Sequence, residues 1–168
     1  MGSVPDIGER KYVPFSESLP DAQAVEARVA GTIFKQGYWV GGVYHATSND
    51  FDATIRGRAY KIEVKDESNY IATNNLCVEL FQGVAHKPSG ISVSESNICI
   101  HYFSDDRIVM FKTQPMRLHI KDKNGEYNLR PFGDNHNQGI LVPISDVTNK
   151  PWCDSVRLNE ITKSKLFL

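Results

Sequence analysis

The chain has 168 residues, 40% hydrophobic and 23% charged, which fits one ordinary globular domain. Its formal net charge of −1 and pI near 6.5 lack the basic signature of many nucleic-acid-binding proteins, so binding of DNA would need local Lys and Arg. No apolar run approaches the roughly 20 residues that cross a membrane, and we see no secretory signal. The three cysteines are scattered and form no CxxC or Cys/His cluster, which favours a reducing, cytoplasmic setting.

The chain begins with a segment that contains three prolines, and we predict an irregular N-terminal arm over residues 1–20. A single domain is expected over residues 21–168. Its first element is a helix over Ala22–Gln36, with Asp21 as the N-cap and Gly37 as the stop.

Strands follow this helix. Residues 37–46 are rich in aromatic and β-branched side chains and predict a strand that Gly41-Gly42 can bulge, with Tyr38 and Trp39 assigned to the core. Later strands are expected over 50–56, 59–66, 75–81, 98–103, 107–112 and 139–144, and a short helix over 113–123. The order of elements predicts an α/β protein in which helices cover a sheet.

The strands over 50–56 and 59–66 form a predicted hairpin. With Gly57-Arg58 as a two-residue turn, Asp52 pairs with Glu63, and alternation places both on one face with Lys65. Opposed residues have Cβ atoms roughly 4.5–5.5 Å apart, so the two carboxylates would repel each other. A divalent cation bound between them would remove that repulsion, so the pair indicates a metal site. The simplest alternative interpretation is a solvated hairpin face that carries ordinary charges.

These residues also resemble a known motif. Asp52 followed by Glu63-Val64-Lys65 resembles the PD-(D/E)xK motif of the restriction-endonuclease-like nucleases, with Phe51 in place of the motif's proline. Two further segments resemble phage and bacterial members that include Holliday-junction resolvases: the strand over residues 73–79, with Asn74 in place of a usual glycine, and the KPSGI loop over 87–91.

The resemblance covers about residues 21–145 and implies a fold, a cofactor and a site. The implied fold is restriction-endonuclease-like, a central mixed β-sheet flanked by helices. The implied cofactor is Mg²⁺, with Mn²⁺ able to substitute. The implied metal ligands are Asp52, Glu63 and the Val64 backbone carbonyl, and Lys65 is the implied catalytic cation.

Other residues are weaker candidates. Glu26 on the first helix and Glu79 on the strand over 75–81 are candidates to complete the metal site, against the alternative of ordinary surface charges. The candidate DNA contacts are Lys87, Asn75, Arg117 and Lys121; for Arg117 and Lys121 a solvated helix face is the favoured alternative, and for Asn75 turn chemistry.

We therefore expect a metal-dependent DNA endonuclease that hydrolyses phosphodiester bonds. Branched DNA is one candidate substrate, and the sequence leaves open whether the protein forms a homodimer. The main alternative is a non-catalytic nucleic-acid-binding or assembly protein that keeps the nuclease fold.

Overall fold

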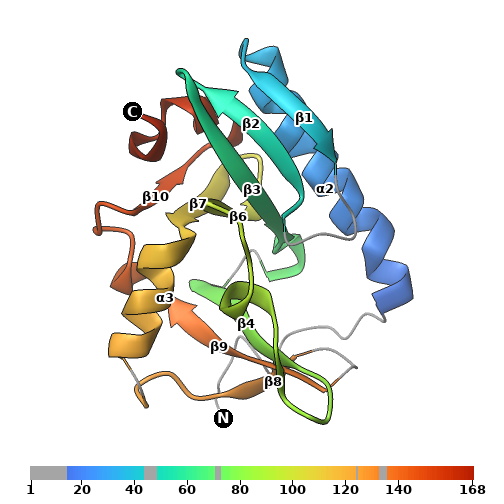
Figure 1. Cartoon of the computed structure of the whole chain (residues 1–168), viewed down its shortest axis with the longest axis vertical. Helices are drawn as coiled ribbons and strands as arrows, with labels where there is room; N and C mark the ends of the chain where they lie inside the picture. The colour runs from blue at the N-terminus through green and yellow to red at the C-terminus, as the bar shows by residue number, and fades with distance from the viewer. Residues whose placement is uncertain (1–14, 44–48, 71–72, 124, 133–135) are drawn as a thin grey trace.

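The computed structural model describes residues 15–43, 49–70, 73–123, 125–132 and 136–168. Its helices are α2 (Phe15–Lys35) and α3 (Thr113–Asp122). Its strands are β1 (Trp39–Val43), β2 (Phe51–Ile55), β3 (Arg58–Asp66), β4 (Asn75–Gln82), β5 (Lys87–Pro88), β6 (Ile98–Ser104), β7 (Arg107–Lys112), β8 (Arg130–Phe132), β9 (Asn137–Pro143) and β10 (Cys153–Val156). Single turns of 3₁₀ helix lie among the loops, and two more, η4 (Leu158–Lys163) and η5 (Lys165–Phe167), end the chain (Figure 1).

The strands form two sheets. The larger has the order β1-β2-β3-β6-β7-β10 and is mixed, because β3 and β6 run parallel while its other pairs are antiparallel. The smaller has the order β5-β4-β9-β8. The predicted α/β class with a mixed sheet is thus confirmed. The four strands β5, β4, β9 and β8 belong to a second sheet that the sequence did not predict.

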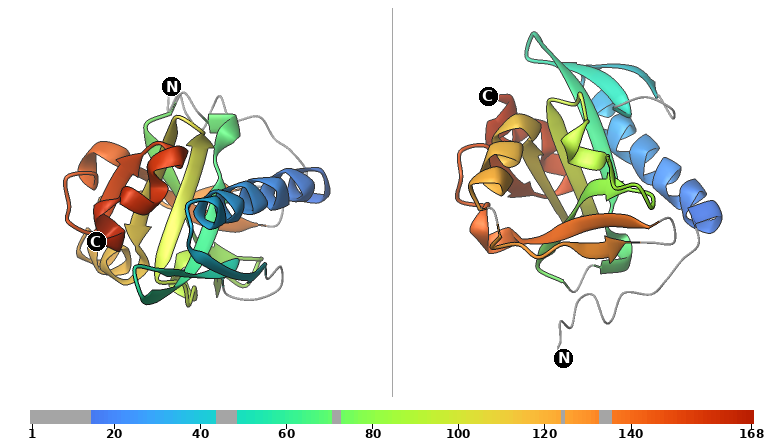
Figure 2. Two further views of the ribbon diagram at one scale, coloured as in Figure 1. Left: turned by 90° about the horizontal axis from the view of Figure 1, so that it is seen from above. Right: turned by 60° about the horizontal axis from the view of Figure 1, so that its bottom comes forward.

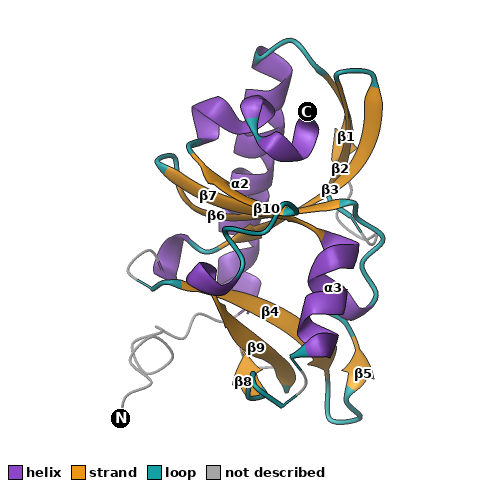
Figure 3. Ribbon diagram, turned by 90° about the vertical axis from the view of Figure 1, so that its left-hand side faces the viewer, coloured by secondary structure: helices purple, strands orange, loops and turns teal. Residues whose placement is uncertain are grey.

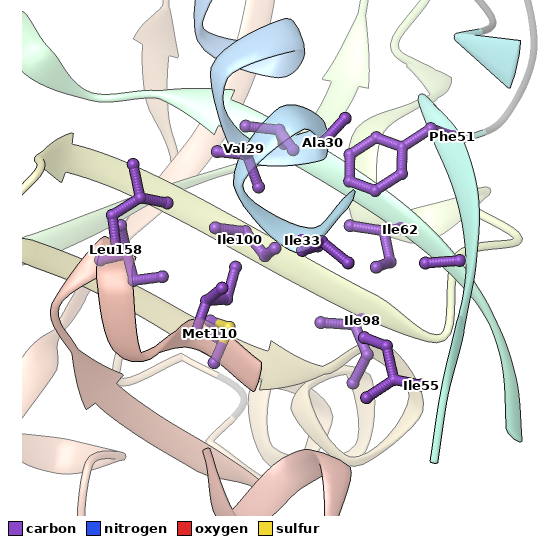
Figure 4. Packing of buried hydrophobic residues seen from close by; sticks show 14 of the residues in the cluster. Val29, Ala30, Ile33, Phe51, Ile55, Ile62, Ile98, Ile100, Met110 and Leu158 are labelled. Atoms are coloured by element: carbon purple, nitrogen blue, oxygen red, sulfur yellow. The ribbon is translucent and has the colours of Figure 1, made fainter. Parts of the chain in front are cut away.

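The larger sheet has a different cover on each face (Figure 3). On one side α2 lies across it, and Val29 and Ile33 pack with Ile62 and Ile100 in a core that the C-terminal 3₁₀ turns complete (Figures 2 and 4). On the other side, the second sheet and α3 bury Leu76, Val78, Phe111 and Met116 among others. The apolar alternation of β2 and β3 produces this arrangement, since one face of each strand is aliphatic and the other polar.

Several element boundaries were predicted correctly. Gly37 has φ +96° directly after α2, and the β1–β2 register shifts between Val40 and Val43, as the Gly41-Gly42 bulge required. The assigned arm is wrong over residues 15–20, which are helical. Pro20 lies in the second turn of α2, where its fixed φ suits a helix and one backbone hydrogen bond is given up.

The hairpin turn was also predicted wrongly. Its two central residues are Arg56 and Gly57, with φ of +51° and +79°, so Asp52 pairs with Lys61 and not with Glu63. Arg56 keeps this unfavourable conformation because its guanidinium donates to the Thr162 carbonyl and lies 5.7 Å from the centre of the Tyr38 ring.

Candidate active site

The polar face of β3 carries the candidate site. Glu63 and Lys65 project from it away from α2, because Ile62 and Val64 fill the core beneath that helix. The Lys65 ammonium lies 3.9 Å from a Glu63 carboxylate oxygen, with the Glu63 side chain 16% exposed and that of Lys65 43%. The predicted pair of glutamate and lysine is therefore brought together at a partly open position.

The structure brings Asp50, which the sequence did not nominate, close enough to Glu63 to affect its charge, whereas Asp52 pairs with Lys61. Asp50 directly precedes β2, and its backbone N–H donates to the carbonyl of Ile62, the residue that also pairs with Phe51. An Asp50 carboxylate oxygen accepts a 2.6 Å hydrogen bond from the Val64 backbone N–H, which fixes this side chain at the end of β3. Asp52 lies two residues farther along the same face and accepts a hydrogen bond from the Asn49 side chain.

Two more carboxylates lie close enough to Glu63 and Lys65 to affect their charges. Burial raises the pKa of Glu63, and Asp50 and Glu79 raise it further against the opposing effects of Lys65 and Arg117. Burial also raises the pKa of Glu26 to about 7, with Asp50 contributing. Both additional glutamates that the sequence nominated thus belong to one acidic cluster, defined here as Glu26, Asp50, Glu63 and Glu79.

Lys65 is the cation of this cluster. Burial disfavours its charge, but the surrounding acidic groups, Glu63 foremost, outweigh burial and raise the pKa of Lys65 above its ordinary value. Lys65 therefore stays protonated at neutral pH and can stabilise negative charge, which is the role that the motif assigns to it.

The neighbouring strand β6 contributes two residues that the sequence did not nominate. Cys99 and His101 lie beside Glu63 and Lys65 in the parallel register and point to the same side of the sheet. Burial raises the pKa of the Cys99 thiol well above its usual range and lowers the pKa of His101 to about 3, so both are uncharged at neutral pH. The alternation of β6 was the available signal, since Cys99 and His101 occupy alternate positions among the apolar residues of this strand.

The cluster fits a hard divalent cation by its donor chemistry, because carboxylate oxygens are the ligands such ions take. Among the described residues, however, no three His, Cys, Asp or Glu side chains are already gathered closely enough to hold a metal ion. The fit therefore rests on the two carboxylates Asp50 and Glu63, with water and substrate oxygens completing the shell, as Mg²⁺ commonly requires.

The nominated DNA contacts are scattered. Lys87 on β5 and Lys121 on α3 are exposed, and Asn75 begins β4. Arg117 is committed elsewhere: its guanidinium donates to the carbonyls of Ile91 and Ser94 and to the Gln114 side chain, so it fixes the loop before β6. Its helix position matched the prediction, but these acceptors occupy the donors that a phosphate would need.

Searches of protein-family models, curated proteins and solved structures find no match for this chain. Across the part of the chain that the structure describes, no helix is both long and apolar enough to span a bilayer.

Proposed function

We propose that this protein is a metal-dependent endonuclease that hydrolyses phosphodiester bonds in DNA, with a restriction-endonuclease-like fold. The observation that supports it best is the acidic cluster around Lys65. A fold selected only for stability gains nothing from placing the Asp50 carboxylate near Glu63 at a site where burial already penalises charge. A cation held between the two carboxylates would offset that cost.

Each residue of the cluster has a defined task in this proposal. Asp50 and Glu63 hold the cation, and the Val64 backbone N–H orients Asp50. The bound Mg²⁺ or Mn²⁺ supplies Lewis-acid polarisation of the phosphate and a more acidic water. Lys65 stabilises the charge that develops on the phosphoryl oxygens and orients the attacking water. Glu26 and Glu79 would add negative charge around the cation.

The test is single-turnover cleavage of supercoiled, linear, single-stranded and four-way-junction DNA, with Mg²⁺, Mn²⁺ or EDTA. We expect cleavage with either metal and none with EDTA. Glu63→Gln removes a ligand charge, so it should weaken metal binding and abolish cleavage. Lys65→Met keeps both carboxylates, so metal still binds while cleavage falls by about a hundredfold or more.

Full activity in EDTA after metal stripping would overturn the proposal, as would a Lys65→Met variant that cleaves like the parent. Binding of DNA without cleavage under every metal condition would instead favour the non-catalytic alternative. Comparison of four-way junctions with linear duplexes decides whether branched DNA is the preferred substrate.

A further inference from the structure

One face of the β1–β3 ribbon continues outward from the acidic cluster. The register pairs Asp52 with Lys61 and Trp39 with Thr54, and paired residues share a face. Residues two apart on a strand also share a face, which links Trp39 through Thr54 and Asp52 to Lys61 and then to Glu63. Trp39 therefore lies on the same face of the sheet as Glu63. Val40, which alternates with Trp39, packs instead into the core beneath α2.

Trp39 was predicted to lie in the core, and the structure contradicts this, because its side chain is 60% exposed. The indole is nevertheless held in place, since it extends along its own strand over Gly41. A Cβ at Gly41 would stand 2.9 Å from the Trp39 Cη2 atom and 3.3 Å from the Asp52 Cβ. The absence of a side chain at Gly41 thus leaves the space that the outer part of the indole occupies.

The surroundings of the indole are suited to a nucleic-acid strand. Lys61 is exposed on the same face, and its backbone N–H and carbonyl are both bonded to Asn97, at 2.7 Å each, so its position is fixed. Ala59, opposite Thr54, is small and exposed. Trp39 and Lys61 thus lie on one face of the sheet, two strands apart, with Asp52 between them. An exposed aromatic ring and a cation on one face can bind a single strand, in which bases stack on aromatic rings and phosphates meet positive charge.

The position of this surface connects it to the proposed reaction. Trp39 pairs with Thr54, and Thr54 with Ala59, so four residues of β3 and two strand spacings separate Trp39 from Glu63. The straight-line distance is roughly 16 Å, which a few nucleotides span. In Figure 3, β1 and the β2–β3 hairpin lie at the opposite end of the molecule from β8 and β9, so the smaller sheet does not cover them.

Resting on the nuclease function proposed above, we propose that Trp39 is a stacking platform for an unpaired nucleobase and Lys61 a contact for the adjoining phosphate. The substrate class is then nucleic acid with a single-stranded segment beside the bond that is cleaved. Bases within an intact duplex have both faces covered by their neighbours and cannot use the platform.

The test uses tryptophan fluorescence. The chain has two tryptophans, and Trp152→Phe leaves Trp39 as the only one. Ca²⁺ replaces Mg²⁺ so that binding is measured without much turnover. We expect a mixed-sequence single-stranded oligonucleotide to quench Trp39 emission strongly, and a blunt duplex of the same length to quench it little.

Variants separate stacking from general effects. Trp39→Ala should weaken single-strand binding about five- to hundredfold, and Trp39→Phe should restore most of it. Phe34→Ala is the matched control: Phe34 is 67% exposed on α2, which packs against the other face of the sheet, and its loss should change nothing. Lys61→Ala should reduce the slope of log affinity against log salt by about 0.7.

Equal binding by the parent and Trp39→Ala would overturn the platform. The platform would also be overturned if Trp39 fluorescence changed with protein concentration and did not change on addition of oligonucleotide, because a second copy of the chain would then cover Trp39. If Trp39 has no effect on binding while Lys65→Met still abolishes cleavage, the platform fails and the nuclease function stands. If the platform binds and no nucleic acid is cleaved, the nuclease function fails alone.

Discussion

The exchange of Asp50 for Asp52 as the metal ligand can be tested by two single substitutions of the same chemistry. Asp50→Asn removes a carboxylate that raises the pKa of Glu63, whereas Asp52→Asn removes one that lies opposite Lys61. The second variant is a matched control, because asparagine at position 52 still presents an oxygen to the Asn49 side chain.

The expected stability change follows from two opposing contributions. Asp50→Asn turns the charge-assisted hydrogen bond from the Val64 N–H into a neutral one, at a cost of about 1 kcal/mol. It also removes the repulsion from Glu63, and two unit charges about 5 Å apart would repel each other by about 3 kcal/mol at an effective dielectric constant of 20. The metal-free variant should therefore be as stable as the parent or more stable, by about 1–2 kcal/mol.

The assays are thermal unfolding with and without Mg²⁺, and single-turnover cleavage. At a free-metal concentration a hundred times the dissociation constant, the parent should gain about 2.7 kcal/mol. Asp50→Asn should lose most of this gain and about a hundredfold or more in cleavage rate, while Asp52→Asn keeps both. The reasoning is refuted if Asp52→Asn loses both properties and Asp50→Asn retains them.

Two further predictions concern stability. Because the folded-state pKa of His101 is about 3, below its ordinary 6.5, the unfolded chain takes up the proton first as pH falls; the free energy of unfolding should drop by about 1.4 kcal/mol per unit between these values. Urea titrations from pH 7 to 4.5 measure how the free energy of unfolding changes with pH. The slope of this free energy against pH should be smaller in His101→Gln than in the parent by this amount, and identical slopes would mean that another group titrates. Gly90→Ala should destabilise the fold by about 2–4 kcal/mol, since Gly90 has φ +55° and a Cβ there would lie 2.3 Å from the Glu79 carbonyl oxygen. Chemical denaturation measures this, with Gly83→Ala as a control that has a similar φ and no atom within 4 Å of the added methyl; an equal loss in both variants would mean that backbone strain alone explains the effect.

The sequence by itself determined several of the elements and the faces of their strands. Alternating apolar residues on β2, β3 and β4 predicted which side chains are buried, and Gly37 predicted the end of α2. These features depend on neighbours along the chain, through strand alternation and the φ preference of glycine. The same local pattern placed Glu63 and Lys65 on the polar face.

Only the tertiary structure decided the hairpin register, and with it that the charge of Asp50, and not that of Asp52, raises the pKa of Glu63. The predicted and observed pairings keep every side chain on the same face, so the apolar pattern fits both equally. The contacts of Arg56 with Thr162 and Tyr38, residues remote from the turn in sequence, select the observed turn. Burial of Trp39 was misjudged for a related reason, because alternation cannot tell which face of an outer strand will find a cover.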